Sequence, residues 1–177
     1  MRKIPRQIAD RLPAAADLFA EKGLNDSKIE DVAAVTGVPK ATLYYYFTGK
    51  EEILAYLLED LLTDIADAVA AIVHTDGTGA ERLELVIGAQ LRAMAQRPAV
   101  CRALIGELGR AARMPVIAEM INTAYQQPVE ALLVAGARDG SLVAQPDPRS
   151  ASMALFGAVT LVERWMIPWH ISQRRKQ

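Results

Sequence analysis

Hydrophobic residues recur at three- and four-residue spacing along most of this 177-residue chain, and no stretch alternates apolar and polar positions as a half-buried strand would. This spacing gathers apolar side chains on one face of a helix. Glycines and prolines divide the pattern into segments of helical length. The sequence therefore predicts an all-α fold.

The first predicted helix ends before Gly23, and its apolar face consists of Ile8, Leu12, Ala15, Ala16 and Phe19. Pro13 interrupts this pattern, because proline in a helix interior removes a hydrogen bond and clashes with the preceding turn. The apolar pattern covers about residues 6–22, so the helix either kinks at Pro13 or starts near Asp10 with Pro13 in its first turn, and we favour the late start. The residues before it would form a mobile arm with three basic side chains, Arg2, Lys3 and Arg6.

Two short helices joined by a tight turn are expected next. Residues 27–30, Ser-Lys-Ile-Glu, have the form of a capping box, so the first of these helices should begin at Ser27. Gly37 ends it, and Pro39 can open the second, which Leu43 anchors from the inside. Such a pair forms a helix-turn-helix, in which the second helix lies in the major groove of DNA and the first braces it.

A second capping box, at residues 48–51, opens a long amphipathic helix that should run to about His74. Its length would let it join two domains. We place a three-helix domain at 1–49 and a larger helical domain at 50–177. Further helices are expected near 80–96, 99–112, 115–139 and 148–167.

Three segments within roughly residues 8–60 form a specific combination: 18–23 (Leu-Phe-Ala-Glu-Lys-Gly), 29–33 (Ile-Glu-Asp-Val-Ala) and 37–47 running into 50–54. Together they resemble the TetR-type (TetR/AcrR) one-component transcriptional regulators. The resemblance implies a DNA-binding domain at the N-terminus and an effector and dimerisation domain after it. It also implies a dimeric repressor that a small apolar or amphipathic effector releases from its operator.

The same resemblance implies DNA contacts along the second short helix. Lys40 and Ala41 would lie near base edges, and Thr42 would contact a base or a phosphate. Tyr44 and Tyr46 would contact phosphates, to which tyrosine hydroxyls can donate. Four successive aromatic residues cannot all face one side of a helix, so Phe47 is expected in the core, while Tyr45 could face either way.

Flanking residues complete the implied DNA contacts. Ser27 and Lys28 would touch the DNA backbone, and Lys50 would hold a phosphate at the N-terminus of the long helix. Pro39 and Ala41 stand where the family usually has Ser and Gly. These changes remove a hydroxyl and add a methyl group, so the operator sequences of other family members cannot be assigned to this protein.

The resemblance implies a homodimer whose last two long helices form a four-helix bundle between subunits. The operator would then be double-stranded and pseudo-palindromic. Small and aliphatic residues suit close helix packing, although the same residues could complete the core of one subunit. The interface candidates are Val129, Leu132, Leu133, Ala151, Ala154, Leu155, Ala158, Val159 and Val162.

An effector pocket is expected among the central helices, where flexible methionines and aromatics would suit an apolar ligand. Ordinary core packing is the simpler explanation for each of these residues, and the sequence does not identify the effector. The candidates are Met94, Leu104, Leu108, Met114, Ile117, Met120, Tyr125 and Trp165.

Composition and charge narrow the function classes. The net charge is −1, yet residues 1–50 carry eight Lys/Arg against six Asp/Glu, so the small basic excess lies with the DNA-reading segment. The single Cys101 excludes an internal disulfide and fits a cytoplasmic location. No apolar stretch reaches the roughly 18–20 residues of a membrane span.

No metal-ligand cluster, phosphate-binding glycine loop or nucleophile motif is present in the sequence. We therefore expect no enzyme, no metal and no cofactor. Two alternatives stay open at this point. One is a DNA-binding regulator that a protein partner controls or that acts constitutively, and the other is a helical enzyme or interaction module with a vestigial helix-turn-helix.

Overall fold

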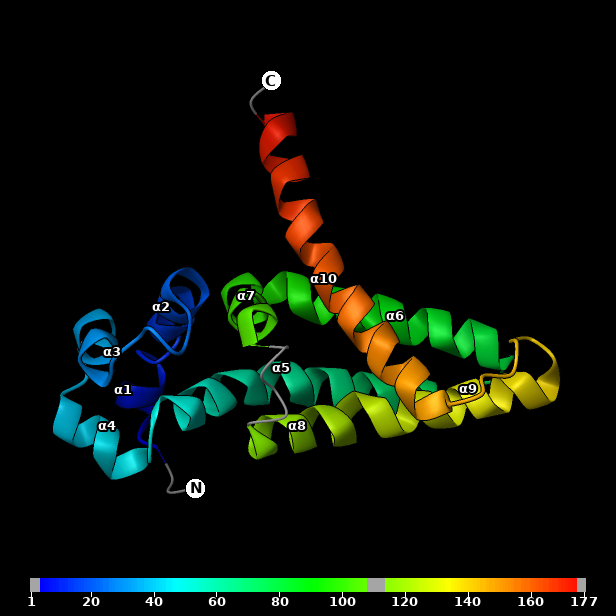
Figure 1. Cartoon of the computed structure of the whole chain (residues 1–177), viewed down its shortest axis with the longest axis horizontal. Coiled ribbons are helices and arrows are strands. Elements are labelled where there is room, and N and C mark those ends of the chain that lie inside the picture. The colour runs from blue at the N-terminus through cyan, green and yellow to red at the C-terminus, as the bar shows by residue number, and fades with distance from the viewer. Residues whose placement is uncertain (1–3, 108–113, 175–177) are drawn as a thin grey trace. The chain divides into compact units, whose positions relative to one another are not determined.

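The computed structural model describes residues 4–107 and 114–174, with side chains up to residue 162. Within these ranges every regular element is a helix, which confirms the all-α prediction (Figure 1). The elements are α1 (Arg6–Ala9), α2 (Ala14–Lys22), α3 (Ile29–Thr36), α4 (Lys40–Tyr46), α5 (Lys50–Ile72), α6 (Gly79–Gln96), α7 (Pro98–Glu107), α8 (Pro115–Ile121), the π-helix η2 (Asn122–Gln126), α9 (Gln127–Asp139) and α10 (Pro148–Arg174).

The chain forms two compact units, and α5 contributes to both. Unit 1 contains Met1–Asp60 and Pro98–Ile117, and unit 2 contains Leu61–Arg97 and Ala118–Gln177. This grouping differs from the division expected at residue 49, because α7 packs against α2. Buried Glu107 also accepts a hydrogen bond from the backbone N–H of Leu24 at 3.3 Å. An apolar helix pattern predicts a buried face but does not say which neighbour covers it.

In unit 1, the first predicted helix is split into α1 and α2. Pro13 directly precedes α2, so α2 starts at Ala14 rather than near Asp10. The proline ring cannot continue a helix that begins before it. Arg6 lies within α1 and forms an ion pair with Asp10 at 3.8 Å, so it is not part of a free arm. Arg2 and Lys3 lie outside the described residues.

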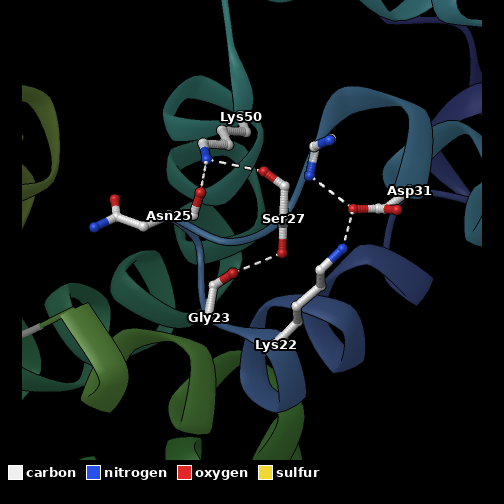
Figure 2. Close-up of polar contacts among 7 residues, drawn as sticks. Lys22, Gly23, Asn25, Ser27, Asp31 and Lys50 are labelled. Atoms are coloured by element: carbon white, nitrogen blue, oxygen red, sulfur yellow. Dashed lines mark hydrogen bonds and ion pairs between the residues drawn. The ribbon is translucent and has the colours of Figure 1, made fainter.

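The loop between α2 and α3 is held by hydrogen bonds from both sides (Figure 2). The ammonium group of Lys50 donates to the backbone carbonyls of Asn25 at 2.8 Å and Ser27 at 2.9 Å. The hydroxyl of Ser27 is buried and donates to the carbonyl of Gly23 at 2.6 Å. The start of α5 therefore fixes the chain entering α3.

The N-terminus of α3 lies two residues later than expected. Its carboxylate partner is Asp31, which accepts from the backbone N–H of Lys28 at 2.8 Å and from the ammonium group of Lys22. The capping box predicted from Ser27 and Glu30 is wrong, because the Ser27 hydroxyl is directed into the loop instead. These hydrogen bonds hold the pKa of the Asp31 carboxyl below its ordinary value, with Lys22 the largest cause.

Unit 2 is a helical bundle in which α6, α9 and α10 contact one another (Figure 1). The helix expected over 115–139 contains the π-helix η2 between α8 and α9. The core of unit 2 is mainly apolar, and its buried side chains include Val86, Met94, Ile121, Tyr125, Val129, Leu132 and Phe156.

The beginning of α6 touches the end of α9 through two glycines. A Cβ atom added at Gly79 would lie 2.3 Å from the Cα atom of Gly136, so backbone meets backbone there. Asp139 accepts from the N–H of Gly79 at 2.7 Å, and the Ser141 hydroxyl oxygen accepts from the N–H of Ala80 at 3.0 Å. The end of α9 thus satisfies amide groups that the first turn of α6 leaves free.

We expect Lys50→Met to destabilise unit 1 by about 1–2 kcal/mol, because two loop carbonyls lose a charged donor while the apolar stem is kept. Urea unfolding followed by circular dichroism measures the change. Lys28→Met is the matched control, since its side chain is exposed. Equal losses in the two variants would contradict a structural role for Lys50.

We expect Gly79→Ala to lower the free energy of unfolding by about 1–3 kcal/mol, because the added methyl group must push two helix backbones apart. Gly88→Ala in the same helix is the control. Its Cβ would approach only the mobile guanidinium end of Arg92, at 3.2 Å, and alanine gains about 0.5–1 kcal/mol of helix propensity. Thermal unfolding distinguishes the two, and similar melting temperatures would refute the close contact.

Candidate nucleic-acid interface

The turn between α3 and α4 is fixed by hydrogen bonds and by one glycine. Gly37 has a φ of 64°, in the left-handed region that favours glycine. The Thr36 hydroxyl donates to the carbonyl of Val32 at 2.7 Å and accepts from the N–H of Val38 at 3.2 Å. Arg11 donates to the carbonyl of Gly37 at 3.2 Å. The direction in which α4 leaves this turn is therefore set.

The helix α4 has one buried side and one exposed side. Leu43 is fully buried and Phe47, which directly follows the helix, is 1% exposed, as expected for Phe47. Thr42 and Tyr46 are half-buried at the margin. The exposed residues define what we name the outer face of α4, and they are Pro39, Lys40, Ala41, Tyr44 and Tyr45.

Tyr45 is a DNA-contact candidate that the sequence left undecided. Its side chain is 59% exposed, compared with 53% for Tyr44. Its ring packs edge-on against that of Tyr46, with centroids 4.9 Å apart. Burial of Leu43 and Phe47, four residues apart, turns Tyr44 and Tyr45 outward. The helical period could have shown this once the buried pair was known.

Lys40 is paired with a carboxylate on the neighbouring helix. Its ammonium group donates to the carboxylate of Glu30 and lies 5.8 Å from the ring centroid of Tyr44. The contact lowers the pKa of the Glu30 carboxyl and raises the pKa of the Lys40 ammonium. Both groups are thus charged at neutral pH, and Glu30 partly neutralises the outer face.

Two residues expected at the DNA surface are used inside the fold instead. Ser27 is 2% exposed, so its hydroxyl is not available to a phosphate. Lys50 binds two backbone carbonyls of the α2–α3 loop rather than lying free at the start of α5. Lys28 is exposed directly before α3 and keeps its position as a candidate.

The candidates for the dimer interface include both buried and exposed residues of α9 and α10. Val129, Leu132 and Val159 are buried in the core of unit 2, so the subunit itself uses them. Leu133, Ala151 and Leu155 are half-buried, and Ala154, Ala158 and Val162 are exposed. Met153 and Leu161 on α10, which the sequence did not single out, are 51% and 44% exposed. An open groove along α9, also not expected, is lined by Ala131, Val134 and Ala135 together with Gln127, Glu130 and Arg138.

The pocket candidates lie in both units. Leu104, Met114 and Ile117 are buried in unit 1, Met94 and Tyr125 are buried in unit 2, and Met120 is half-buried. Leu108 and the side chain of Trp165 lie outside the described part of the chain. The candidates with described side chains are therefore divided between the two units.

Among the residues with described positions, no group of three or more His, Cys, Asp or Glu side chains is placed to hold a metal ion. Within the same part of the chain, no helix has the length and apolar content needed to cross a membrane.

Two family models match this chain. Residues 12–57 match the model for bacterial regulatory proteins of the tetR family. Residues 76–168 match the model for the tetracyclin repressor-like C-terminal domain. The first match contains the helix-turn-helix and the outer face of α4, and the second contains most of unit 2.

Curated relatives include two regulators of similar length. The HTH-type transcriptional repressor KstR2 of Rhodococcus jostii is 28% identical over 160 residues, covering 89% of this chain and 78% of that protein. The fatty acid metabolism regulator protein of Bacillus subtilis is 26% identical over 165 residues, covering 91% and 82%. These relatives are transcriptional regulators rather than enzymes.

Solved structures share the fold. The regulator FadR from Bacillus subtilis, in complex with stearoyl-CoA, has a TM-score of 0.73 at 24% identity, covering 92% of this chain and 88% of that one. The ketosteroid regulator KstR2 of Mycobacterium tuberculosis has a TM-score of 0.72 at 24% identity, covering 92% and 84%. From the two family models and these relatives, the chain belongs to the TetR family and is a DNA-binding transcriptional regulator.

Proposed function

We propose that this protein is a dimeric repressor that reads its operator with the outer face of α4 and releases it when a small apolar or amphipathic effector binds. The observation that carries the proposal is the composition of that face. An amine, a methyl group and two phenols lie exposed on a helix whose turn is rigidly held. These groups suit base edges and phosphates.

Different residues of the face suit different parts of DNA. Lys40 is at the start of α4, where a recognition helix approaches base edges, and the exposed methyl of Ala41 suits a thymine methyl group. Thr42 would contact a base or phosphate. Tyr44, Tyr45 and Tyr46 offer hydroxyls to phosphates, and exposed Lys28 does the same from the start of α3.

An exposed apolar stripe on α10 supports dimerisation. Ala154, Ala158 and Val162 recur every four residues, and Met153 and Leu161 lie beside them. The small residues would let a second copy approach closely. A two-fold axis there would present two α4 helices, which must lie roughly 34–36 Å apart to enter successive major grooves.

Effector control is supported by the relatives and by the continuity of α5. One curated relative is named as a fatty acid metabolism regulator and the other as the repressor KstR2. The solved structure of KstR2 from Mycobacterium tuberculosis, a different protein, is described as a ketosteroid regulator. An acyl or ring-fused effector is therefore the class we propose. Because α5 belongs to both units, a ligand that selects one position of α5 would change the spacing of the two α4 helices.

The role of α4 is tested by binding of the purified protein to genomic fragments, followed by fluorescence anisotropy on the selected operator. We expect Lys40→Ala to change which base is preferred at one position, costing about 1–3 kcal/mol at the native base. Lys28→Ala should weaken binding to all sequences about equally and reduce its salt dependence. The opposite pattern would refute these roles, and the absence of any preferred fragment would refute the repressor.

Removing the negative charge that pairs with Lys40 should strengthen DNA binding. We expect Glu30→Gln to raise affinity about threefold to tenfold at low salt, as one surface charge interaction of roughly 1 kcal/mol allows. Glu84→Gln, at an exposed position of α6 in unit 2, is the control. Anisotropy titrations measure both, and equal affinities would show that Glu30 does not restrain Lys40.

A further inference from the structure

The apolar core of unit 2 contains a small cluster of polar side chains. Gln90 on α6 and Tyr125 in η2 are 0% exposed, and Thr160 on α10 is 1% exposed. The ring of Tyr125 packs edge-on against that of Phe156, with centroids 5.1 Å apart, and Gln90 donates to the carbonyl of Phe156 at 3.4 Å. Tyr125 thus contacts the side chain of Phe156, and Gln90 contacts its backbone carbonyl.

The orientation of the Gln90 amide follows from its partners. Its NH₂ group donates to the Thr160 hydroxyl oxygen at 3.1 Å as well as to the Phe156 carbonyl. Thr160 in turn donates to the same carbonyl at 2.6 Å. Since a carbonyl can only accept, the nitrogen of Gln90 must face this pair. Its oxygen therefore points elsewhere.

Two polar atoms of this cluster have no hydrogen-bond partner among the described residues. They are the side-chain oxygen of Gln90 and the hydroxyl of Tyr125. A buried polar group without a partner costs about 1–3 kcal/mol, and Leu and Phe would fill the same space without that cost. Tyr125 also lies in a π-helical turn, a rare feature that is frequent at functional sites. Buried polar atoms of this kind are paired by an ordered water or by a ligand, and the position of Tyr125 in a π-helical turn favours a ligand here.

The chemistry of the two atoms defines that partner. The Gln90 oxygen accepts a hydrogen bond, and the Tyr125 hydroxyl can donate one, since burial raises its pKa and keeps it protonated. Among the side chains that are described, the buried charged residue is Glu107, which belongs to unit 1. The buried side chains that are described in unit 2 carry no charge, so they would not offset the cost of desolvating a charged ligand group at this cluster.

We propose that Gln90 and Tyr125 bind a neutral hydroxyl group of an apolar ligand, with the hydroxyl donating to the Gln90 oxygen and accepting from Tyr125. The identification of this ligand as the effector rests on the proposed function. A ketone can use only Tyr125, because it has no proton to donate. The negative charge of a carboxylate would be repelled by the Gln90 oxygen. The expected order of affinity is therefore alcohol, then ketone, then carboxylate.

The test uses the full-length protein and probes of ten carbons: decan-1-ol, decahydro-2-naphthol, decan-2-one and sodium decanoate. Calorimetric titration without DNA measures their affinities. We expect an alcohol to bind more tightly than the ketone or the carboxylate. Gln90→Leu and Tyr125→Phe should each weaken alcohol binding about tenfold, as loss of one buried hydrogen bond implies. Ketone binding should fall in Tyr125→Phe alone.

Controls separate binding from folding. Tyr125→Phe removes only an unpaired hydroxyl, so its unfolding free energy should not fall, and Tyr56→Phe in unit 1 should bind every probe as the original protein does. The inference is overturned if neither alcohol binds, if the carboxylate binds as tightly, or if both variants retain alcohol affinity. A loss of ketone binding equal in both variants would also overturn it, because general damage to the core would produce that result.

Operator release, followed by anisotropy with the same probes, distinguishes the two proposals. Alcohol binding that depends on Gln90 and Tyr125 but leaves the DNA complex intact would support the site and refute effector control through it. Release by decanoate that is unchanged in both variants would support effector control and refute the assigned site.

Discussion

The outer face of α4 depends on the burial of Leu43 and Phe47. The helix α4 has only seven residues, and an isolated helix of that length is unstable in water. Its stability and its rotation about its own axis therefore come from the two side chains that enter the core of unit 1. That rotation turns Lys40, Ala41, Tyr44 and Tyr45 outward. The apolar contacts of a short helix thus decide which polar groups it exposes.

Some charged side chains near α4 stabilise the fold of unit 1, and others are exposed where they could bind DNA. Lys50 binds the backbone carbonyls of Asn25 and Ser27 in the α2–α3 loop, and Asp31 binds the N–H of Lys28 where that loop meets α3. Lys40 is paired within the protein, but its partner is an exposed carboxylate that a base or phosphate can replace. The number of lysines near a recognition helix is therefore a poor guide to the number of DNA contacts.

Sequence patterns predicted the fold class and the helix-turn-helix because both follow from local spacing. Gly37 and Phe47 agree with the structure for that reason. The capping box predicted at residues 48–51 is wrong in its carboxylate, because Glu52 rather than Glu51 accepts from the N–H and the hydroxyl of Thr48. The roles of Ser27 and Lys50 could not be predicted, since their partners depend on how a loop folds back. The burial of Val129, Leu132 and Val159 within one subunit could not be predicted either. Helical periodicity identifies an apolar face, but it does not identify the helix that covers that face.

The contact between Gly79 and Gly136 limits how unit 2 can adapt to a ligand. With no side chains between the two backbones, α6 and α9 cannot slide closer or repack at that end. Gln90 lies about eleven residues further along α6, roughly 16 Å from the contact at 1.5 Å per residue. Separating the helices at the glycine contact would break the hydrogen bonds from Gly79 to Asp139 and from Ala80 to Ser141, so a molecule entering beside Gln90 would separate them with less cost by rotation about that contact. The bundle would then open as a hinge with a fixed pivot rather than by shear.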